Sequence, residues 1–374
     1  MEFQLTIEQR LIQKVARDFA QTEIEPIAAQ VDRDKKIPSD MARKMAKVRL
    51  LGMVIPEQYG GSGAGYLNWI LALEQLNYPV SSCSVFANMT NMVGGAIAEF
   101  GTEEQKQRYL KHICDGELIA SWVFTEPATG SDPLSLVTRA KLEGDCWVIN
   151  GTKRFHTLGH LDGPAVIFAN VEGRKTTAFI VEKNIEGYAC SKPFELMGNH
   201  GLETVDTSLH NVRIPKSNLF GEVGKGFDIM LRVAAVGRLS LSIKSVAMAQ
   251  AALDEAVKYA KQRTRRGVPI ASMQAIQWML AEMAVRVEAA RWVTYRTAFL
   301  KEQGEDISKE SAMNKLFASR VAKEVADMSM QVHGSYGFTK DFKIERIYRD
   351  AKENELIEGS SEIQRSIIAR YLVA

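Results

Sequence analysis

The pattern of hydrophobic and polar positions changes twice along the chain. Residues 1 to about 115 carry apolar side chains at helical spacing, residues 116–225 carry short apolar or alternating runs, and residues 226–374 return to long helical stretches. The runs of the middle zone are LIASWVF, WVIN, AVIFAN, TAFIVE and TVDTSLHNVRI. Such runs, rich in Val, Ile, Phe and Thr and bounded by Gly, Asn, Asp and Pro, are typical of strands. The pattern therefore predicts a β domain between two helical regions.

The fold class predicted from these zones is mostly α with a central β domain, an α+β arrangement. Because no helix separates the strands of the middle zone, an antiparallel barrel or sandwich is favoured over parallel βαβ units. Glycines at 267, 304 and 334 divide the last zone into three long helices, and residues 360–372 add a fourth. The predicted domains are an N-terminal helical domain at 1–115, the small β domain at 116–225 and a C-terminal four-helix bundle at 226–374.

Helix starts and buried helix faces can be predicted at particular positions. Thr6 with Gln9, and Thr102 with Gln105, have the spacing of capping boxes, in which side chains satisfy the first free backbone donors of a helix. In the last zone, apolar residues at helical spacing predict one buried face per helix. For the third long helix this face is Phe317, Val321, Val325 and Met328.

Composition excludes several classes of protein. With 374 residues, 46% apolar and 25% charged, the chain has the balance of a globular protein of two or three packed units. The net charge of +2 comes without a basic stripe, so no nucleic acid partner is expected. No run approaches the roughly 18 apolar residues of a membrane span. The four cysteines are far apart in the sequence and the chain contains no HExxH motif, so no bound metal is expected. The first residues do not resemble a leader peptide, which favours a cytoplasmic location.

Eight short segments occur in one order, and together they resemble the acyl-CoA dehydrogenase family. They are IPEQYGG (55–61), FGTEEQKQRYL (100–110), FTEPATGSD (124–132), INGTK (149–153), NVRIPKSNLFGEVGKGF (211–227), MQAIQWMLAEMA (273–284), HGSYGF (333–338) and IEGSSEIQR (357–365). One segment alone would be a weak signal, whereas eight in order cover essentially the whole chain. The resemblance implies α,β-dehydrogenation of an acyl-CoA thioester by tightly bound FAD.

The resemblance places the catalytic base at Glu358. The α proton of a thioester can be removed by a carboxylate placed over it, and the β hydride requires an acceptor, which the flavin N5 supplies. Enclosure by apolar neighbours should raise the pKa of Glu358. A subset of the family places the base directly before an arginine of the first bundle helix, but here Gly237 precedes Arg238 and cannot abstract a proton. Taken alone, Glu358 could equally be a solvated residue near a helix start.

The resemblance also implies the contacts of FAD and substrate. The first flavin edge is Trp122, Phe124 and Thr125, and the second is Phe155 and Thr157, with Thr157 at N5. The positions implied to reach the FAD of a neighbouring subunit are Arg263, Gln274, Gln331, Gly334 and Ser335, and those at its phosphates and adenosine are Ser360 and Glu362. Ser131, Arg238 and Gly359 are implied to contact the substrate. Without the family, the threonines fit strand propensity and Arg263 fits a solvated basic helix end.

Five residues depart from the pattern of the family and leave the acyl group open. They are His156, His160, His200, Ala235 and Arg266. His156 should point away from the flavin, because side chains alternate across a strand and Phe155 and Thr157 face the cofactor. An arginine at 266 can stack on adenine in place of an aromatic side chain.

The implied partners are an acyl-CoA substrate, an electron-transferring flavoprotein and further copies of this chain in a homotetramer, a dimer of dimers. Three alternatives remain open at this point. The acyl group could be carried by an acyl-carrier protein in a biosynthetic pathway, or the flavin could serve an oxidase or monooxygenase. The third alternative is a flavin-free binding protein of the same fold.

Overall fold

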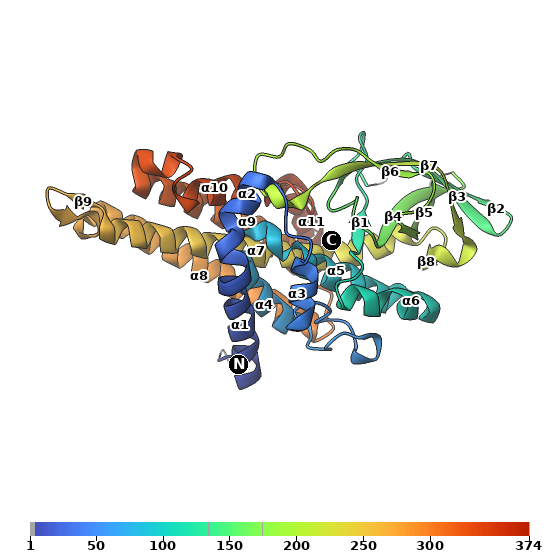
Figure 1. Ribbon diagram of the computed structural model, residues 1–374, viewed down its shortest axis with the longest axis horizontal. Helices are drawn as coiled ribbons and strands as arrows, with labels where there is room; N and C mark the ends of the chain where they lie inside the picture. The colour runs from blue at the N-terminus through green and yellow to red at the C-terminus, as the bar shows by residue number, and fades with distance from the viewer. Residues whose placement is uncertain (1–3, 134, 174, 374) are drawn as a thin grey trace.

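The computed structural model describes residues 4–133, 135–173 and 175–373, which form helical regions on either side of a β region (Figure 1). The N-terminal helices are α1 (Ile7–Phe19), α2 (Ala28–Asp34), α3 (Met41–Lys47), α4 (Tyr66–Asn77), α5 (Val85–Phe100) and α6 (Glu103–Cys114). The strands of the β region are β1 (Ser121–Val123), β2 (Arg139–Glu143), β3 (Cys146–His156), β4 (Pro164–Val171), β5 (Lys175–Glu182), β6 (Tyr188–Cys190), β7 (Val205–Pro215) and β8 (Leu219–Phe220). The last region holds α7 (Gly226–Gln262), β9 (Thr264–Arg265), β10 (Val268–Pro269), α8 (Gln274–Glu302), α9 (Ser308–His333), α10 (Lys343–Glu353) and α11 (Ser361–Val373). The predicted fold class is confirmed.

Both predicted capping boxes are present at helix starts. The backbone N–H of Gln9 donates to Thr6 Oγ1 at 3.2 Å, and the N–H of Thr6 donates to Gln9 Oε1 at 2.9 Å. Thr102 and Gln105 make the same reciprocal pair at 3.3 and 3.1 Å. Each box satisfies two backbone donors that the first turn of a helix leaves free, which fixes where α1 and α6 begin.

The sheet of the β region runs in the order β6-β7-β3-β2-β4-β5-β8, and β1 pairs with β4 beside this path. Most pairs are antiparallel, as predicted, but β1 and β2 both run parallel to β4, so the sheet is mixed. Along β4, Ala165 and Ile167 face a core within the β region, whereas Val166 and Phe168 face the helices. A strand covered on both faces explains why its sequence is continuously apolar.

The C-terminal region contains the four predicted long helices and one shorter helix, α10, that the pattern did not predict. The buried face of α9 also differs from the prediction. Val321 and Val325 are buried, but Phe317 is exposed, and the rest of the buried face consists largely of small residues. Lys315, one turn from Ala318, is completely buried. Small residues allow α9 to approach α7 closely, which leaves the large aromatic side chain outside.

A fully buried ion pair joins the loop after β1 to strand β3. Lys153 Nζ lies 2.7 Å from Glu126 Oε1, and neither side chain is exposed. Glu126 also accepts the backbone N–H groups of Val137 and Thr138, and Lys153 donates to the Phe124 carbonyl at 3.2 Å. Burial lowers the pKa of Lys153 to about 8, although the Glu126 carboxylate opposes this shift. The pair therefore holds two segments together only while both partners are present.

Replacing Lys153 with methionine should destabilise the protein strongly. Glu126 would remain buried without its counter-charge, and breaking a buried pair in this way costs about 3–5 kcal/mol in the free energy of unfolding. Lys141→Met, at an exposed position on β2, is the matched control and should change stability by less than about 0.5 kcal/mol. Urea titrations followed by circular dichroism measure both. Equal stabilities of the two variants would show that the pair contributes nothing.

Candidate active site

The two predicted flavin edges lie side by side in the structure. The backbone N–H of Arg154, in β3, donates to the Thr125 carbonyl at 2.9 Å, which joins β3 to the segment after β1. Trp122 in β1 and Phe124 directly after it both pack against Phe168, with ring centroids 4.8 and 5.1 Å apart. The segment with Trp122, Phe124 and Thr125 is therefore held next to the end of β3, where Phe155 and Thr157 follow.

Phe155 adopts a strained conformation that exposes its ring. Its φ is +57°, in the left-handed region, and the register of β3 against β7 shifts between Lys153 and His156. The side chain is 59% exposed and lies 5.4 Å from the ring of Phe194. Such a backbone costs free energy for a bulky residue and is found mostly where function requires it. An exposed aromatic ring beside the half-buried Thr157 fits a planar ring system such as a flavin.

His156 points into the β domain, on the opposite side from the exposed Phe155. Its Nδ1 lies 2.8 Å from Thr207 Oγ1 and its Nε2 lies 2.8 Å from Ser121 Oγ. Burial lowers the pKa of His156 well below its ordinary value, which favours the neutral ring. His156 thus ties β1, β3 and β7 together as an internal polar contact. The other two unusual histidines lie beside acidic residues, His160 near Glu203 (3.5 Å) and His200 near Asp32 (3.0 Å).

Glu358 directs its carboxyl group at a gap in α7. A Cβ atom placed on Gly237 would lie 2.5 Å from Glu358 Oε2, so the absent side chain leaves the space that the carboxyl group occupies. Burial raises the pKa of Glu358, while the charges of Arg238 and Lys315 oppose the rise. The backbone reaches this position with φ of +55° at Glu358 and +83° at Gly359. A left-handed glutamate is unusual and requires support from its surroundings.

That support comes from side-chain donors on three helices. Gln364 Nε2, in α11, donates to the carbonyls of Glu358 and Gly359 at 2.9 and 2.7 Å. Arg238 Nε, in α7, donates to the Glu358 carbonyl at 3.4 Å, and Lys315 Nζ, in α9, donates to the Gly359 carbonyl at 2.7 Å. Sequence reasoning found Arg238 but missed Gln364 and Lys315. Gln364 lies within the IEGSSEIQR segment but was given no role, and the signal for Lys315 was a lysine among the small residues of α9.

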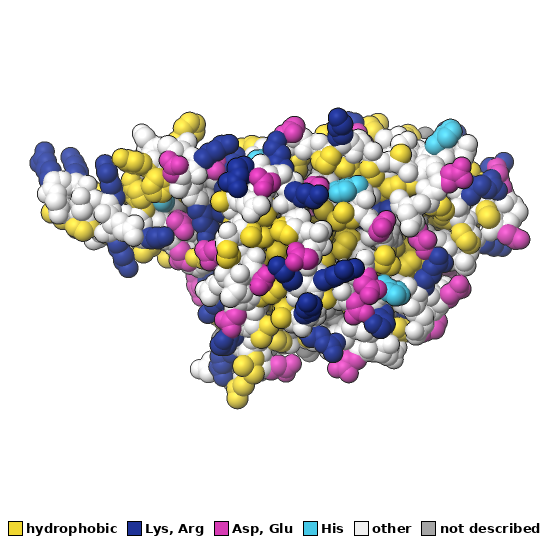
Figure 2. Space-filling view, viewed as in Figure 1, with side chains coloured by type: hydrophobic (Ala, Val, Ile, Leu, Met, Phe, Trp, Pro, Cys, Tyr) yellow, Lys and Arg dark blue, Asp and Glu magenta, His cyan; other side chains and the backbone are white. Residues whose placement is uncertain are grey.

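A second group of predicted residues lies at the far end of α7. Arg263 follows the last residue of α7, and its guanidinium lies 5.3 Å from the ring centroid of Tyr336. Tyr336 belongs to a short 3-10 turn, η8 (Gly334–Phe338), and Gln274 begins α8. The structure thus brings together Arg263 and the segment that contains Gln331, Gly334 and Ser335, with Gln274 on the adjoining element. Figure 2 shows Lys and Arg side chains gathered at this tip of the molecule.

The contact of α7 with the β region and the Arg263 group lie at opposite ends of this long helix. Gly226, the first residue of α7, packs against Thr177 and Ala178 of β5. From there α7 runs for 37 residues, or about 55 Å at 1.5 Å per residue, before Arg263 is reached. Figure 1 shows the same separation, with β9 at one end and the β region at the other. Arg263 therefore lies far from the β5 end of α7 in its own chain.

The remaining predicted residues lie near Glu358 or on the surface. Ser360 follows Gly359, and its carbonyl accepts the backbone N–H of Gln364 at the start of α11. Glu362 is exposed in the first turn of that helix. Ser131 is exposed in the loop after β1. The structure therefore keeps Ser360 close to the proposed base in sequence and space.

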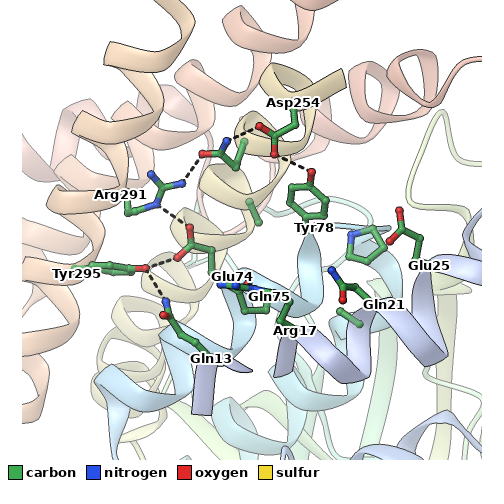
Figure 3. A pocket seen from close by; sticks show the side chains of 14 residues that line it. Gln13, Arg17, Gln21, Glu25, Glu74, Gln75, Tyr78, Asp254, Arg291 and Tyr295 are labelled. Atoms are coloured by element: carbon green, nitrogen blue, oxygen red, sulfur yellow. Dashed lines mark hydrogen bonds and ion pairs between the residues drawn. The ribbon is translucent and has the colours of Figure 1, made fainter. Parts of the chain in front are cut away.

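A cavity of about 460 Å³ lies between α1, α4, α7 and α8, away from the residues predicted to act in catalysis (Figure 3). Several of its polar side chains are hydrogen-bonded to one another. Arg291 Nε donates to Glu74 Oε1 at 2.8 Å, Tyr295 donates to the other oxygen of Glu74, and Tyr78 donates to Asp254 at 2.8 Å. Groups that already satisfy one another hold helices together, so this cavity is a structural polar network.

Two further observations concern the residues that the structure describes. Among residues 4–133, 135–173 and 175–373, no group of three or more His, Cys, Asp or Glu side chains is arranged to hold a metal ion. Within the same ranges, no helix is both long enough and apolar enough to cross a membrane.

Comparison with known proteins agrees with this geometry along the whole chain. Models of the acyl-CoA dehydrogenase N-terminal, middle and C-terminal domains match residues 6–117, 121–212 and 224–373. The chain is 39% identical to a 3-(aryl)acrylate reductase of Clostridium sporogenes, over 98% of this chain and 99% of that protein. It is 37% identical to the short-chain specific acyl-CoA dehydrogenase of Clostridium acetobutylicum, over 99% of both. A solved chain from work on the electron transferring flavoprotein of Acidaminococcus fermentans superposes with a TM-score of 0.97 at 36% identity, over 100% of both chains. The chain belongs to the acyl-CoA dehydrogenase family.

Proposed function

We propose that this protein is an FAD-dependent acyl-CoA dehydrogenase in which Glu358 removes the α proton of the substrate. The observation that carries the proposal is the setting of Glu358. Its carboxyl group fills the gap at Gly237, and its left-handed backbone is held by Gln364 and Arg238. A strained acidic residue, partly desolvated and supported by donors from other helices, has the properties of a general base.

The chain's own residues account for the proton transfer. As the α C–H bond breaks, its proton moves to the Glu358 carboxylate, and the β hydrogen leaves with its electron pair while the Cα–Cβ double bond forms. Burial brings the pKa of Glu358 towards working pH, which improves a base as long as it stays ionised. In reverse, the same carboxylic acid returns the proton to an enoyl thioester. The name of the Clostridium sporogenes relative, 3-(aryl)acrylate reductase, describes a reaction in this reverse direction.

The residues of the β domain fit the isoalloxazine ring of FAD. Bound FAD supplies the hydride acceptor that no side chain can provide. Trp122, Phe124 and Phe155 offer apolar surface at the two adjoining edges, and Thr125 and Thr157 offer hydroxyl groups there. Ser360 and Glu362 are proposed near the phosphates and adenosine, and Ser131, Arg238 and Gly359 along the thioester and its carrier.

We further propose that FAD is shared between subunits of an oligomer. Arg263 lies about 55 Å along α7 from the contact of Gly226 with the β region of its own chain, so it is available to a neighbouring chain. A second observation favours association. Trp278, Val285, Trp292 and Phe299 of α8 are all exposed, and their seven-residue spacing places them along one helix face. An exposed apolar stripe of this length is typical of an interface, and a dimer of dimers is the proposed form.

The substrate and the electron acceptor are tested by one set of measurements. Anaerobic bleaching of the flavin by a panel of acyl-CoA and acyl-carrier thioesters identifies the acyl group and its carrier. Re-oxidation of the bleached enzyme by an electron-transferring flavoprotein, compared with oxygen, separates a dehydrogenase from an oxidase. The similarity to a chain studied with such a flavoprotein supports the first outcome.

Glu358→Gln should keep FAD bound and abolish most of the reaction with substrate. The amide preserves size and hydrogen-bonding shape but cannot take a proton, and a general base contributes about 10²–10⁴-fold to rate. Stopped-flow bleaching by a reactive thioester measures the loss. Glu305→Gln, in the exposed loop after α8, is the control and should bleach at the wild-type rate. A Glu358→Gln enzyme that bleaches normally would refute the assignment of the base.

The rate of bleaching should rise with pH through the pKa of Glu358. The carboxylate is the active form, and burial raises this pKa above its ordinary value, so activity is lost as pH falls through the raised pKa. Below that pKa the rate should fall about tenfold per pH unit. A profile that is flat over the acidic range, with FAD still bound, would contradict the role of an ionising carboxylate.

Arg263→Ala should weaken retention of FAD although Arg263 is far from the flavin edges of its own chain. Loss of a charged hydrogen bond to the diphosphate costs about 1.5–3 kcal/mol, equivalent to roughly 10- to 150-fold in affinity. Arg265→Ala, on the neighbouring exposed strand β9, is the matched control. Equilibrium dialysis measures FAD binding, and sedimentation measures assembly. A wild-type protein that purifies as a monomer with full FAD would overturn the shared site.

A further inference from the structure

Lys315 is a buried cation whose place in the structure needs an explanation. It lies in α9, is 0% exposed, and directs Nζ to the Gly359 carbonyl at 2.7 Å. Within the described ranges, no acidic side chain forms an ion pair with Lys315 inside 4.0 Å. Burial lowers the pKa of Lys315 to about 8, and the charge of Glu358 opposes this shift. A lysine held in this position is costly unless a nearby negative charge compensates it.

The charged groups around Lys315 come from every neighbouring element. The charged side chains near Lys315 are Arg238 of α7, Glu355 of the turn after α10, Glu358 of the segment before α11 and Glu362 of α11. The negative charge of an ionised Tyr371, also in α11, would raise the pKa of Arg238. Two of these acids are occupied elsewhere. Glu355 accepts Lys352 Nζ at 2.7 Å, and Glu362 is highly exposed and lies 3.6 Å from Arg365. Glu358 remains as the enclosed anion that faces two buried cations.

We propose that Lys315 is a positioning residue for the reaction, whose ammonium group supplies the counter-charge that keeps Glu358 ionised while it anchors the Gly359 carbonyl. The inference rests on the proposed role of Glu358 as base. A carboxyl group enclosed by protein tends to take up a proton, and a protonated base cannot accept another. The cation on α9 offsets this tendency without a direct contact that would tie up the carboxylate oxygens. Arg238, on α7, adds a second positive charge near Glu358.

The charge of Lys315 can be separated from its hydrogen bond by two substitutions. Lys315→Met removes both, whereas Lys315→Gln keeps an N–H donor and removes only the charge. In both variants the rise of bleaching rate with pH should move to higher pH by at least about one unit, because a nearby opposite charge lowers a carboxyl pKa by that much or more. Measurements below about pH 8, where Lys315 holds its proton in the wild type, make the comparison valid.

Lys323→Met, on an exposed position of the same helix, is the matched control and should leave the profile unchanged. If the profile of Lys315→Gln or of Lys315→Met coincides with that of the wild type, the counter-charge assignment is wrong. A purely structural role of Lys315 would lower the amount of folded enzyme without moving the profile.

A double-mutant cycle tests the same pair without any reaction. Lys315→Met should lower the melting temperature of the purified protein more in the Glu358 background than in the Glu358→Gln background, because only the carboxylate needs the cation. Equal losses in both backgrounds would overturn the proposal. Failure of the proposed dehydrogenase function and failure of the proposed role of Lys315 give different results. If no thioester bleaches the wild-type enzyme, the dehydrogenase function is wrong. The double-mutant cycle still shows, by melting temperature alone, whether Lys315 and Glu358 are coupled.

Discussion

Burial of one long helix on almost all sides is the constraint on which the rest of this structure depends. α7 begins against the β domain at Gly226, passes the proposed base at Gly237 and ends at Arg263. Small side chains let its neighbours approach its backbone, as Ser329 does when its hydroxyl donates to the Ala252 carbonyl at 2.7 Å. Because helical rise is fixed, α7 acts as a rigid spacer between the flavin edges, the base and the basic tip. In the proposed oligomer the site is divided between chains because this spacer cannot bend back.

Much of the fold could be predicted from sequence because it depends on local signals. Capping at Thr6 and Thr102 and the change from helical to strand periodicity need no long-range information. The parallel pairing of β1 with β4 could not be predicted, since it joins segments more than forty residues apart. The buried face of α9 was partly misassigned for a physical reason: apolarity favoured Phe317, but close helix packing selects small residues and excludes the large ring.

Sequence motifs marked the candidate base, but they did not identify all the side chains that hold its backbone in place. Glu358 is marked by the IEGS segment, whereas Gln364 and Lys315 act through backbone carbonyls that only the folded chain brings to them. Charge alone does not reveal function either. The polar network around Glu74 and Arg291 is as charged as the site, but its members satisfy one another. The groups around Glu358 hold its backbone and leave the carboxyl oxygens without a close ion pair among the described residues. This free carboxyl group, in contrast to the occupied one of Glu74, is what supports a role for Glu358 in proton transfer.

The gap at Gly237 has a consequence for how such a protein could evolve. An acid at position 237 would point towards Glu358, and because a Cβ atom there would lie 2.5 Å from Oε2, the flexible end of Glu358 would have to shift. A chain with both acids would confine two carboxylates in one enclosed space, where ionisation of one suppresses ionisation of the other. In the proposed mechanism, adding the new acid first would create such a pair of carboxylates. Losing Glu358 first would remove the proposed base, so neither order of the two substitutions is expected to leave the reaction unchanged.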